Sequence, residues 1–491
     1  MRRAATVPAR VCFLTVLLVG AGCAPSPPNV VVILIDDLGW ADTGVYGSTF
    51  YKTPHIDRLA SEALRFSQFY AASSVCSPTR ASIMTGKHPA RLDLTNWIGG
   101  EQNGLLQQAE YVRQLPLSEE TLGEAFAAAG YATGYIGKWH LGQTGFLPDT
   151  QGFDDVFAVN EAGQPGAYFS PYENPNWPLT NVPDLANDAP GTYLTDRLTD
   201  AATSFIGSHT QEPFLLVLSH YAVHTPLQAP DSLVQDYRAR ALALGPETEA
   251  DFEDEHGATT KLRQDHPTYA AMIERVDASV GRVMAALRET GLEENTIVVF
   301  LSDNGGLSTL VRRSASQATS NRPLRSGKGW LYDGGIRSPL LIRTPDGRGA
   351  GGVATTPSQT VDIYPTLLEL AGLPQKPGQH RDGRSLAPAL DGAQSLASLP
   401  IYWHFPHYHG SGNRPGGAIR DGDLKLVEWF EDGSTELYDL SVDVGERNDL
   451  VSERPQDAER LLEMLKAWRE EVGANMPTLT DSAMRGEAPG Q

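Results

Sequence analysis

Cysteine is scarce in this chain of 491 residues. It has only three, and two of them, Cys12 and Cys23, lie close to the N-terminus. Because Cys76 is the only cysteine left for the folded body, no disulfide can stabilise that body. The fold must therefore rely on its hydrophobic core, and the single remaining thiol calls for a chemical explanation.

Basic residues are also few, and they form no run. The chain has 39 Lys and Arg against 60 Asp and Glu, which gives a formal net charge of −21. Phosphate contacts need clustered Lys and Arg, so the composition argues against a nucleic-acid partner.

No internal repeat of 20–50 residues is present, which excludes solenoids and propellers. Hydrophobic residues make up 41% of the chain, and this excludes global disorder.

No apolar run is long enough to span a bilayer. The run at residues 11–22 follows three arginines and is typical of an export signal. It ends at Cys23 after small residues, which resembles a bacterial lipoprotein cleavage box with Gly20 in place of the usual leucine. We expect residues 1–22 to be a signal peptide and Cys23 to be lipidated. The protein would then be exported, as a periplasmic or outer-membrane lipoprotein of a bacterium, with free secretion as the alternative.

Short apolar runs alternate with amphipathic segments along the first 395 residues. Runs at 29–35, 214–218 and 296–301 are of the kind that is buried on both faces of a parallel sheet, and 339–342 is a fourth candidate strand. Helices are expected at residues 53–64, 118–129, 266–290 and 360–370. This alternation predicts an α/β domain over residues 29–395, with a large, mostly parallel sheet sandwiched by helices.

The pattern changes after about residue 395. Residues 418–427 and 435–440 are typical of short antiparallel strands, and 458–472 of an amphipathic helix. We therefore expect a smaller C-terminal α+β subdomain at 396–475 with a short antiparallel sheet, followed by a disordered tail at 476–491.

Acidic residues follow two of the apolar runs. Asp36 and Asp37 come directly after the first run, and Asp303 and Asn304 follow the run at 296–301. Ligands of open α/β sheets bind at the carboxyl ends of the strands. Four oxygen ligands at that edge suit Ca²⁺, or Mg²⁺ as the alternative, better than Zn²⁺. For either pair alone, a turn or helix cap is the competing explanation.

Residues 76–80 read Cys-Ser-Pro-Thr-Arg, and a Thr-Gly pair follows at 85–86. This motif resembles the signature of the formylglycine-dependent sulfatases of the alkaline phosphatase superfamily. Lys87 stands where many members of the family have arginine. Further blocks similar to that family occur in the same order, at residues 137–142, 218–226, 303–305, 325–339 and 436–446. The resemblance covers about residues 29–470 and implies an alkaline-phosphatase-like fold.

The resemblance also implies an activity, that of a sulfuric ester hydrolase. Cys76 would be oxidised to formylglycine (3-oxoalanine) by a formylglycine-generating or anaerobic sulfatase-maturating enzyme, and the hydrated aldehyde would be the nucleophile. The implied catalytic residues are Cys76, Arg80, Lys138, His140, His224 and Lys328. The implied metal ligands are Asp36, Asp37, the modified Cys76, Asp303 and Asn304.

The other roles implied by the resemblance belong to cations and histidines. Arg80 would position the modified side chain, and Lys138 and Lys328 would hold sulfate oxygens. His224 would donate a proton to the leaving oxygen, and His140 would handle the protons of the hydrated aldehyde. A sulfate ester needs such a nucleophile, positive charge and acid.

The segment 402–409 is rich in aromatic residues and histidine. Three interpretations remain open: a sugar-binding rim that uses His404, His407 and His409, a zinc site made of the same histidines, or ordinary packing. Because Pro406 interrupts regular structure, we favour a loop over the cleft with the three histidines binding substrate. Residues 160–187 would form a second wall.

The same segment resembles bacterial polysaccharide sulfatases, some of which act on sulfated galactose or N-acetylgalactosamine, so we expect such a saccharide as substrate. Two other functions remain open. The chain could hydrolyse phosphonate or phosphate monoesters, as relatives in the same superfamily do, or it could be a non-catalytic lipoprotein that binds sulfated glycans.

Overall fold

The computed structural model describes residues 26–392 and 396–485. The expected signal peptide at 1–22 and the expected lipidation site Cys23 lie outside the described residues. Within the described ranges, no helix is both long and apolar enough to cross a bilayer.

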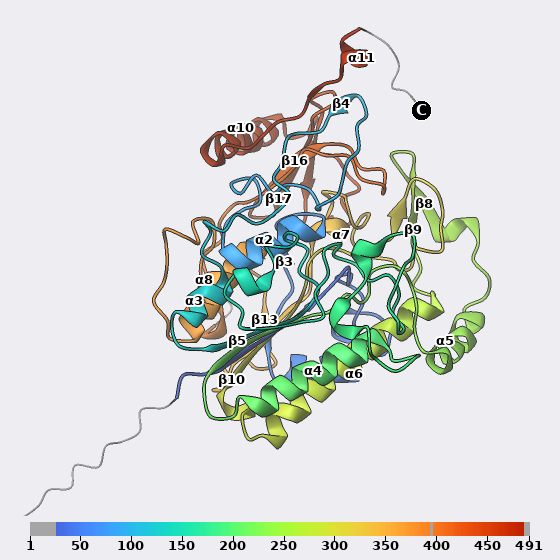
Figure 1. Cartoon of the computed structure of the whole chain (residues 1–491). Coiled ribbons are helices and arrows are strands. Elements are labelled where there is room, and N and C mark those ends of the chain that lie inside the picture. The colour runs from blue at the N-terminus through green and yellow to red at the C-terminus, as the bar shows by residue number, and fades with distance from the viewer. Residues whose placement is uncertain (1–25, 393–395, 486–491) are drawn as a thin grey trace, which may run out of the picture.

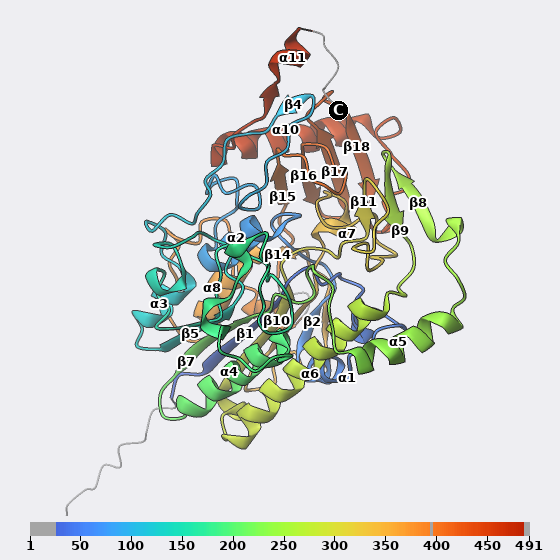
Figure 2. The same cartoon turned by 45° about the vertical axis from the view of Figure 1, so that its right-hand side comes forward.

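The core of the molecule is an eight-stranded sheet with the order β13-β2-β12-β10-β1-β7-β5-β6 (Figures 1 and 2). Its central strands are parallel and wholly buried, as their apolar sequences predict. The parallel strands are β1 (Asn29–Ile35), β5 (Ala132–Gly137), β6 (Asp155–Phe157), β7 (Phe214–Ser219) and β10 (Thr296–Ser302). On the other side of β10 lie β12 (Leu340–Arg343), β2 (Leu64–Phe66) and β13 (Val353–Ala354). The strand expected at 339–342 is present as β12 and runs antiparallel to β10.

Helices cover both faces of this sheet, as expected. Residues Val31 and Ile33 of β1 belong to the core on one face, and their neighbours Val30 and Val32 belong to the core on the other. The first face is covered by α1 (Pro54–Ser61), α4 (Leu194–Ser208), α5 (Asp231–Ala243) and α6 (Pro267–Glu289). The second face is covered by α2 (Cys76–Thr85), α3 (Leu122–Ala127), α8 (Ile363–Leu370) and α9 (Ala387–Leu390).

Three expected helices differ at their ends. α1 ends at Ser61, because the chain turns into β2. α3 begins only at Leu122, since Thr121 caps it by accepting a hydrogen bond from the backbone of Glu124. α8 is preceded by a 3₁₀ turn at Thr360–Asp362.

A smaller C-terminal subdomain packs against the first, as Figure 2 shows. Its antiparallel sheet consists of β15 (Ile401–Phe405), β16 (Gly416–Asp421), β17 (Leu424–Trp429) and β18 (Thr435–Asp439). One face of the sheet packs on α10 (Pro455–Val472). The other packs on aromatic residues of the large domain, among them Trp330 and Tyr332. The expected α+β subdomain is confirmed.

One expectation for this region is wrong. Residues 402–405 lie in β15 and do not form a loop, because Pro406 ends the strand instead of preventing it. In the described part of the expected tail, β19 (Thr478–Leu479) pairs with β4 (Leu106–Gln107) and is followed by α11 (Asp481–Met484). The remaining short elements are β3 (Phe69–Tyr70), β8 (Phe252–Glu255), β9 (Ala258–Lys261), β11 (Thr309–Leu310), β14 (Ser358–Gln359) and α7 (Asp333–Ile336).

Candidate active site

Acidic side chains from two neighbouring strands meet at the carboxyl edge of the large sheet. β1 and β10 are adjacent and parallel, and their last residues stand opposite each other. The residues that follow these two strands therefore lie close together. The backbone N–H of Asp37 donates to Asp303 Oδ1 at 3.1 Å, and Asn304 Nδ2 donates to Asp37 Oδ1 at 2.8 Å. The edge predicted for a cation site thus holds both pairs, with Asp36 also fully buried.

The donor set of this cluster fits a hard divalent cation. Ligand atoms of Asp36, Asp37, Cys76 and Asp303 all lie within 4.8 Å of one another. Among the described residues nothing donates a hydrogen bond to the buried Asn304 Oδ1. Burial raises the pKa of Asp36 to about 7, so a nearby cation would favour its ionised form. Carboxylate and amide oxygens are ligands of Ca²⁺ and Mg²⁺, whereas zinc sites use His and Cys.

Cys76 is the first residue of α2, and all ten residues of that helix are buried. Its Sγ lies 3.5 Å from Asp36 Oδ1 and 3.4 Å from Lys328 Nζ. Burial raises the pKa of the thiol to about 12, so the unmodified residue is protonated at neutral pH and a weak nucleophile. The helix N-terminus favours negative charge next to this residue.

Arg80 lies one turn after Cys76 on α2. Its Nε donates to Asp303 Oδ2 at 2.8 Å, and its Nη1 donates to the carbonyl of Lys138 at 2.8 Å and to Ser219 Oγ at 2.7 Å. These contacts tie α2 to the residues at the ends of β5, β7 and β10. Arg80 therefore holds α2 in register with the acidic cluster.

Two buried lysines contact the carboxylates. Lys138 follows β5, and its Nζ donates to Asp36 Oδ2 at 2.6 Å. Lys328 lies in the loop before α7, and its Nζ is 2.7 Å from Asp37 Oδ1. With Arg80, these cations balance the three carboxylates. A divalent cation would then give the site a net positive charge that attracts an anion.

Two histidines face the same cluster in their neutral form. His224 Nδ1 donates to the carbonyl of Thr225 at 2.8 Å, so its Nε2, which is 3.8 Å from Asp37 Oδ2, carries the free lone pair. His140 Nε2 donates to the carbonyl of Ile98 at 3.2 Å, which leaves Nδ1 free. Burial, followed by the nearby lysines, lowers the pKa of His224 to about 3 and holds that of His140 well below its usual range. Each ring is therefore neutral at pH 7 and keeps one nitrogen with a free lone pair.

Two residues of the predicted site have left-handed backbone conformations. Asp37 and His140 have φ values of 60° and 59°, a region that residues other than glycine rarely adopt. Such conformations persist where the surroundings enforce them, and functional sites are common places for them. Ser326, which has a φ of 58°, lies two positions before the predicted site residue Lys328.

The structure separates the three histidines of the segment 402–409. His409 lies beside Lys328: a Cβ on Gly329 would come 2.4 Å from its Nδ1. The backbone N–H of Ser411 donates to that Nδ1 at 3.2 Å, so Nε2 carries the proton. Burial, followed by Lys328, lowers the pKa of His409 to about 4, which keeps the ring neutral.

His404 and His407 lie elsewhere, and both are buried. His404 Nε2 donates to the carbonyl of Asn475 at 2.8 Å, on the side of β15 that faces α10. His407 Nε2 is 2.8 Å from Thr95 Oγ1. The described residues contain no metal-capable group made of the three histidines. Contact of His404 and His407 with substrate stays a prediction.

Segment 95–100 contributes to the site without any motif that predicts it. The carbonyl of Ile98 accepts the hydrogen bond from His140 Nε2 described above. The backbone N–H of Ile98 donates to Ser77 Oγ at 3.1 Å. The ring of Trp97 lies 6.5 Å from that of His140. The expected second wall at 160–187 also reaches the site, since a Cβ on Gly163 would overlap the imidazole of His140.

Comparison with known proteins agrees with this geometry. The sulfatase family matches residues 28–373, and the C-terminal domain of N-sulphoglucosamine sulphohydrolase matches residues 326–472. The chain is similar to the N-acetylgalactosamine-6-sulfatase of Sus scrofa, with 34% identity over 440 residues, 86% of this chain and 76% of that protein. It is also similar to a sulfatase of Formosa agariphila, with 31% identity over 538 residues, 93% of this chain and 90% of that protein.

Solved structures show the same architecture. The crystal structure of Ps i-CgsB matches with a TM-score of 0.73 and 28% identity, over 90% of this chain and 93% of that one. The family match spans most of the large domain and includes both acidic pairs, Cys76 and both lysines. The chain belongs to the sulfatase family of the alkaline phosphatase superfamily and is a sulfuric ester hydrolase.

Proposed function

We propose that this enzyme removes sulfate from a sulfated saccharide of the galactose or N-acetylgalactosamine type, using formylglycine made from Cys76 and one Ca²⁺. The observation that carries the proposal is the buried cluster at the start of α2, where three cations and three carboxylates surround the thiol. The similarity to the N-acetylgalactosamine-6-sulfatase of Sus scrofa supports the sugar. So does the likeness to Ps i-CgsB in complex with k-i-k-neocarrahexaose, at 28% identity and a TM-score of 0.71.

Asp36, Asp37, Asp303 and Asn304 would hold the cation, which when bound supplies positive charge for a sulfate oxygen and acidifies a nearby hydroxyl group. A formylglycine at position 76 supplies the nucleophile, and a maturating enzyme must form it before the protein is active. The high pKa of the buried thiol supports this order of events, because an unmodified Cys76 would be a poor nucleophile.

The chain's own cations and histidines would do the remaining work. Lys138 and Lys328 already point into the cluster, and exchanging one carboxylate contact for a sulfate oxygen keeps each ammonium group paired. Arg80 would keep position 76 in place through Asp303. His224 would pass a proton to the leaving oxygen from Nε2, after the charge of the bound ester favours its protonated form.

His409 would help to recognise the alcohol part of the ester. Its protonated Nε2 is free because Ser411 occupies Nδ1, and the ring adjoins Lys328. A neutral donor at this place can bond a sugar hydroxyl without disturbing the charge balance. We expect His409→Ala to raise KM for a sugar sulfate and to leave KM for a simple aryl sulfate unchanged, with exposed His55→Ala as the matched control.

The test of the function is release of inorganic sulfate. The protein would be produced together with a formylglycine-generating enzyme and assayed on sulfated galactose, N-acetylgalactosamine, N-acetylglucosamine and fucose. Cys76→Ala is the control, and mass spectrometry of the peptide around position 76 reports the modification. Release from galactose or N-acetylgalactosamine sulfate that is lost in the control supports the proposal. A formylglycine-bearing protein that releases sulfate from neither sugar would contradict it.

Hydrolysis of phosphonate esters is tested in the same preparation. The fold is shared with a phosphonate monoester hydrolase of Agrobacterium radiobacter, with a TM-score of 0.62 and 21% identity, which is a likeness of fold alone. We expect a higher kcat/KM for an aryl sulfate than for an aryl phosphonate. The intact cluster also argues against a purely glycan-binding role.

We further propose that the protein is exported as a lipoprotein anchored through Cys23. The sequence before Cys23, with its arginines, apolar run and small residues, supports this location. Expression in a bacterium, followed by membrane fractionation, tests it. Cys23→Ala should move the protein out of the membrane fraction, and equal partition of the two forms would contradict the anchor.

A further inference from the structure

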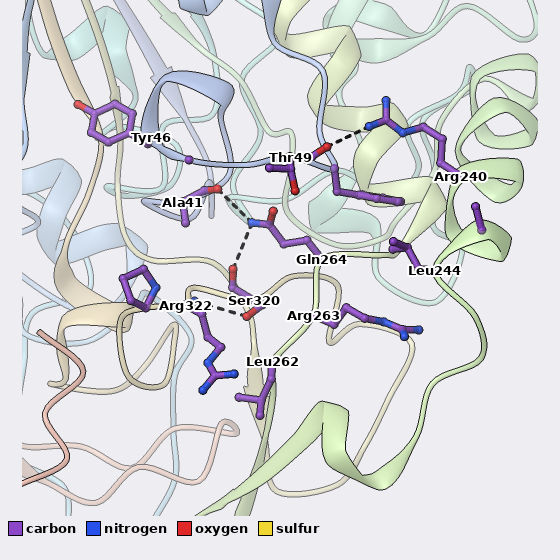
Figure 3. A pocket seen from close by; sticks show the side chains of 14 residues that line it. Ala41, Tyr46, Thr49, Arg240, Leu244, Leu262, Arg263, Gln264, Ser320 and Arg322 are labelled. Carbon is purple, nitrogen blue, oxygen red and sulfur yellow. Dashed lines mark hydrogen bonds between the residues drawn. The ribbon is translucent and has the colours of Figure 1, made fainter.

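A cavity outside the catalytic cluster is lined by basic and apolar side chains. Its volume is about 580 Å³, and it lies between the loop after β1, the end of α5, residues 262–264 and residues 320–323 (Figure 3). The charged residues that line it are Arg240, Arg263 and Arg322, with no acidic residue among its lining. Acidic residues outnumber basic ones in the whole chain, 60 to 39, whereas the charged residues that line this cavity are all basic.

Arg240 is held at the cavity by neutral groups. Its Nη2 donates to the carbonyl of Thr49 at 3.1 Å, as Figure 3 shows. Its guanidinium also lies over the ring of Phe50, 5.5 Å from the centroid. No carboxylate among the described residues pairs with it. The position of this guanidinium is therefore fixed while its charge stays uncompensated.

Arg322 stands at the other end of the cavity, with Gln264 between it and Arg240 (Figure 3). Within the described part of the chain, the Arg322 guanidinium has no ion pair. Arg263 differs, since its Nε donates to Asp265 Oδ2 at 2.6 Å. The side-chain amide of Gln264 already makes a hydrogen bond within the protein, because its Nε2 donates to the carbonyl of Ala41 at 3.0 Å. Two guanidinium groups thus remain available to a ligand.

We propose that this cavity binds a sulfated saccharide unit away from the ester that is cleaved. A guanidinium presents two parallel N–H donors that match the oxygens of a sulfate group. The volume lies in the range of small-ligand sites, and Leu244, Leu262 and Pro323 offer apolar surface to the C–H face of a sugar ring. This inference rests on the proposed saccharide substrate.

The wall of the cavity is connected to the catalytic loop by Asn321. This buried residue lies between the lining residues Ser320 and Arg322. Its Nδ2 donates to the carbonyl of Gly306 at 2.9 Å, and Gly306 follows Asn304 by two positions. A sulfated chain held in the cavity is therefore kept at the same edge of the large sheet as the catalytic cluster. Such retention raises the local concentration of ester groups, so it affects KM for a chain more than kcat.

The kinetic test compares two double variants with the same change in charge. Arg240→Gln/Arg322→Gln removes both free guanidinium groups, and Arg58→Gln/Arg460→Gln removes two arginines that do not line the cavity. With a chondroitin 6-sulfate hexasaccharide, we expect the first variant to raise KM about tenfold, the equivalent of about 1.4 kcal/mol. For the first variant, kcat with the hexasaccharide, and both kcat and KM with 4-nitrocatechol sulfate, should equal those of the control double variant. Equal KM values for the hexasaccharide in the two variants would overturn the inference.

A binding measurement separates this inference from the proposed catalytic function. Fluorescein-labelled chondroitin 6-sulfate hexasaccharide is titrated into Cys76→Ala protein, with and without the cavity substitutions, and its desulfated form serves as the comparison. We expect about tenfold weaker binding when Arg240 and Arg322 are replaced, and no such loss in the matched control.

Each other outcome of the titration contradicts the inference. Absence of binding, equal binding of the desulfated chain, or full displacement by inorganic sulfate at matched ionic strength would overturn it, the last because the cavity would then be a simple anion site. Since the titration needs neither formylglycine nor turnover, failure of the sulfate-release assay together with intact binding would count against the proposed function alone.

Discussion

Lys425, on the C-terminal sheet, donates to Asp333 Oδ1 at 2.8 Å, and both side chains are fully buried. Asp333 begins α7, at the end of the loop that carries Lys328. Lys425 also donates to Glu446 Oε1 at 2.7 Å, and Glu446 Oε2 accepts the backbone N–H of Asp333 at 2.7 Å. One buried network thus joins the C-terminal subdomain to the loop that carries Lys328.

Replacement of Lys425 by methionine should destabilise the protein strongly. The ammonium group separates two buried carboxylates: burial raises the pKa of Glu446 to about 7, whereas Lys425 and two arginines hold that of Asp333 below its usual range against the effect of burial. Loss of one partner of a buried ion pair costs about 3–5 kcal/mol. Chemical denaturation of Lys425→Met should show a loss of that size in the free energy of unfolding.

The double variant Lys425→Met/Glu446→Gln identifies the cause. It removes one of the two negative charges that the single variant leaves unpaired, so part of the lost stability should return. A double variant that is less stable than Lys425→Met would show that packing around the lysine stem, and not charge, dominates.

Lys328→Met should lower kcat, measured on protein whose folded fraction is determined by circular dichroism, because the substitution also breaks a buried ion pair with Asp37. Lys328 Nζ lies against Asp37 and Cys76, where the proposed reaction would develop charge. Removal of one such stabilising donor lowers kcat by about 10²–10³-fold. Steady-state kinetics on an aryl sulfate measure the effect. Lys87→Met, which breaks a pair with Glu119, is the control and should keep kcat near the wild-type value. Similar kcat values for the two variants would refute the role given to Lys328.

The positions of the two acidic pairs were predictable because each pair directly follows an apolar strand, and the carboxyl ends of parallel strands lie at the same edge of a sheet. That β1 and β10 are neighbours in the sheet is a long-range pairing, which only the structure supplies. Asp36, Asp37, Asp303 and Asn304 therefore lie where the sequence places them. The motif at Cys76 is equally local, because its helix begins at the cysteine itself.

The roles of the C-terminal histidines depend on tertiary structure. In β15, Trp403 faces the large domain and donates to the carbonyl of Ala71, so the alternation of a strand turns His404 toward α10. His409 reaches Lys328 only because residue 329 is glycine with a φ of +89°. The contact of Ile98 with His140 and the antiparallel direction of β12 also arise from pairings across long stretches of chain. No local pattern in the sequence encodes such pairings.

Removal of divalent cations should lower the thermal stability of the enzyme. The clustered carboxylates gain a partner when a cation binds, and a ligand at a hundred times its Kd adds about 2.7 kcal/mol to the stability of the folded state. Differential scanning calorimetry of chelator-treated protein should show Tm rising as Ca²⁺ is added. Asn304→Ala, which removes the free Oδ1, should need more Ca²⁺ for the same rise. Asp42→Asn is the control, because Asp42 is buried nearby with hydrogen bonds of its own. A Tm that does not respond to Ca²⁺ or Mg²⁺ would contradict a cation site.

The pair of Arg91 and Asp382 should make stability depend on pH in the acid range. Arg91 Nη2 donates to Asp382 Oδ1 at 2.7 Å, and the backbone N–H of His88 donates to Asp382 Oδ2 at 2.8 Å. Burial opposes ionisation of Asp382, but these hydrogen bonds outweigh it and lower its pKa. In acid, the unfolded chain therefore binds a proton at this position before the folded protein does. Stability from the pair is fully present above the unfolded pKa of about 4 and is lost as the pH falls through the lower folded pKa.

Asp382→Asn should remove this contribution. At pH 7, urea denaturation should show a loss of about 1.5–3 kcal/mol, the worth of hydrogen bonds to a charged group. The difference from wild type should shrink as the pH falls below about 4, because the wild-type carboxyl is then protonated as well. Asp236→Asn, at an exposed residue of α5, should differ little from wild type at either pH. If the effect of Asp382→Asn were the same at pH 7 and pH 3, the loss would come from packing or from the backbone contact, and the ion pair would contribute nothing to the acid sensitivity of the fold.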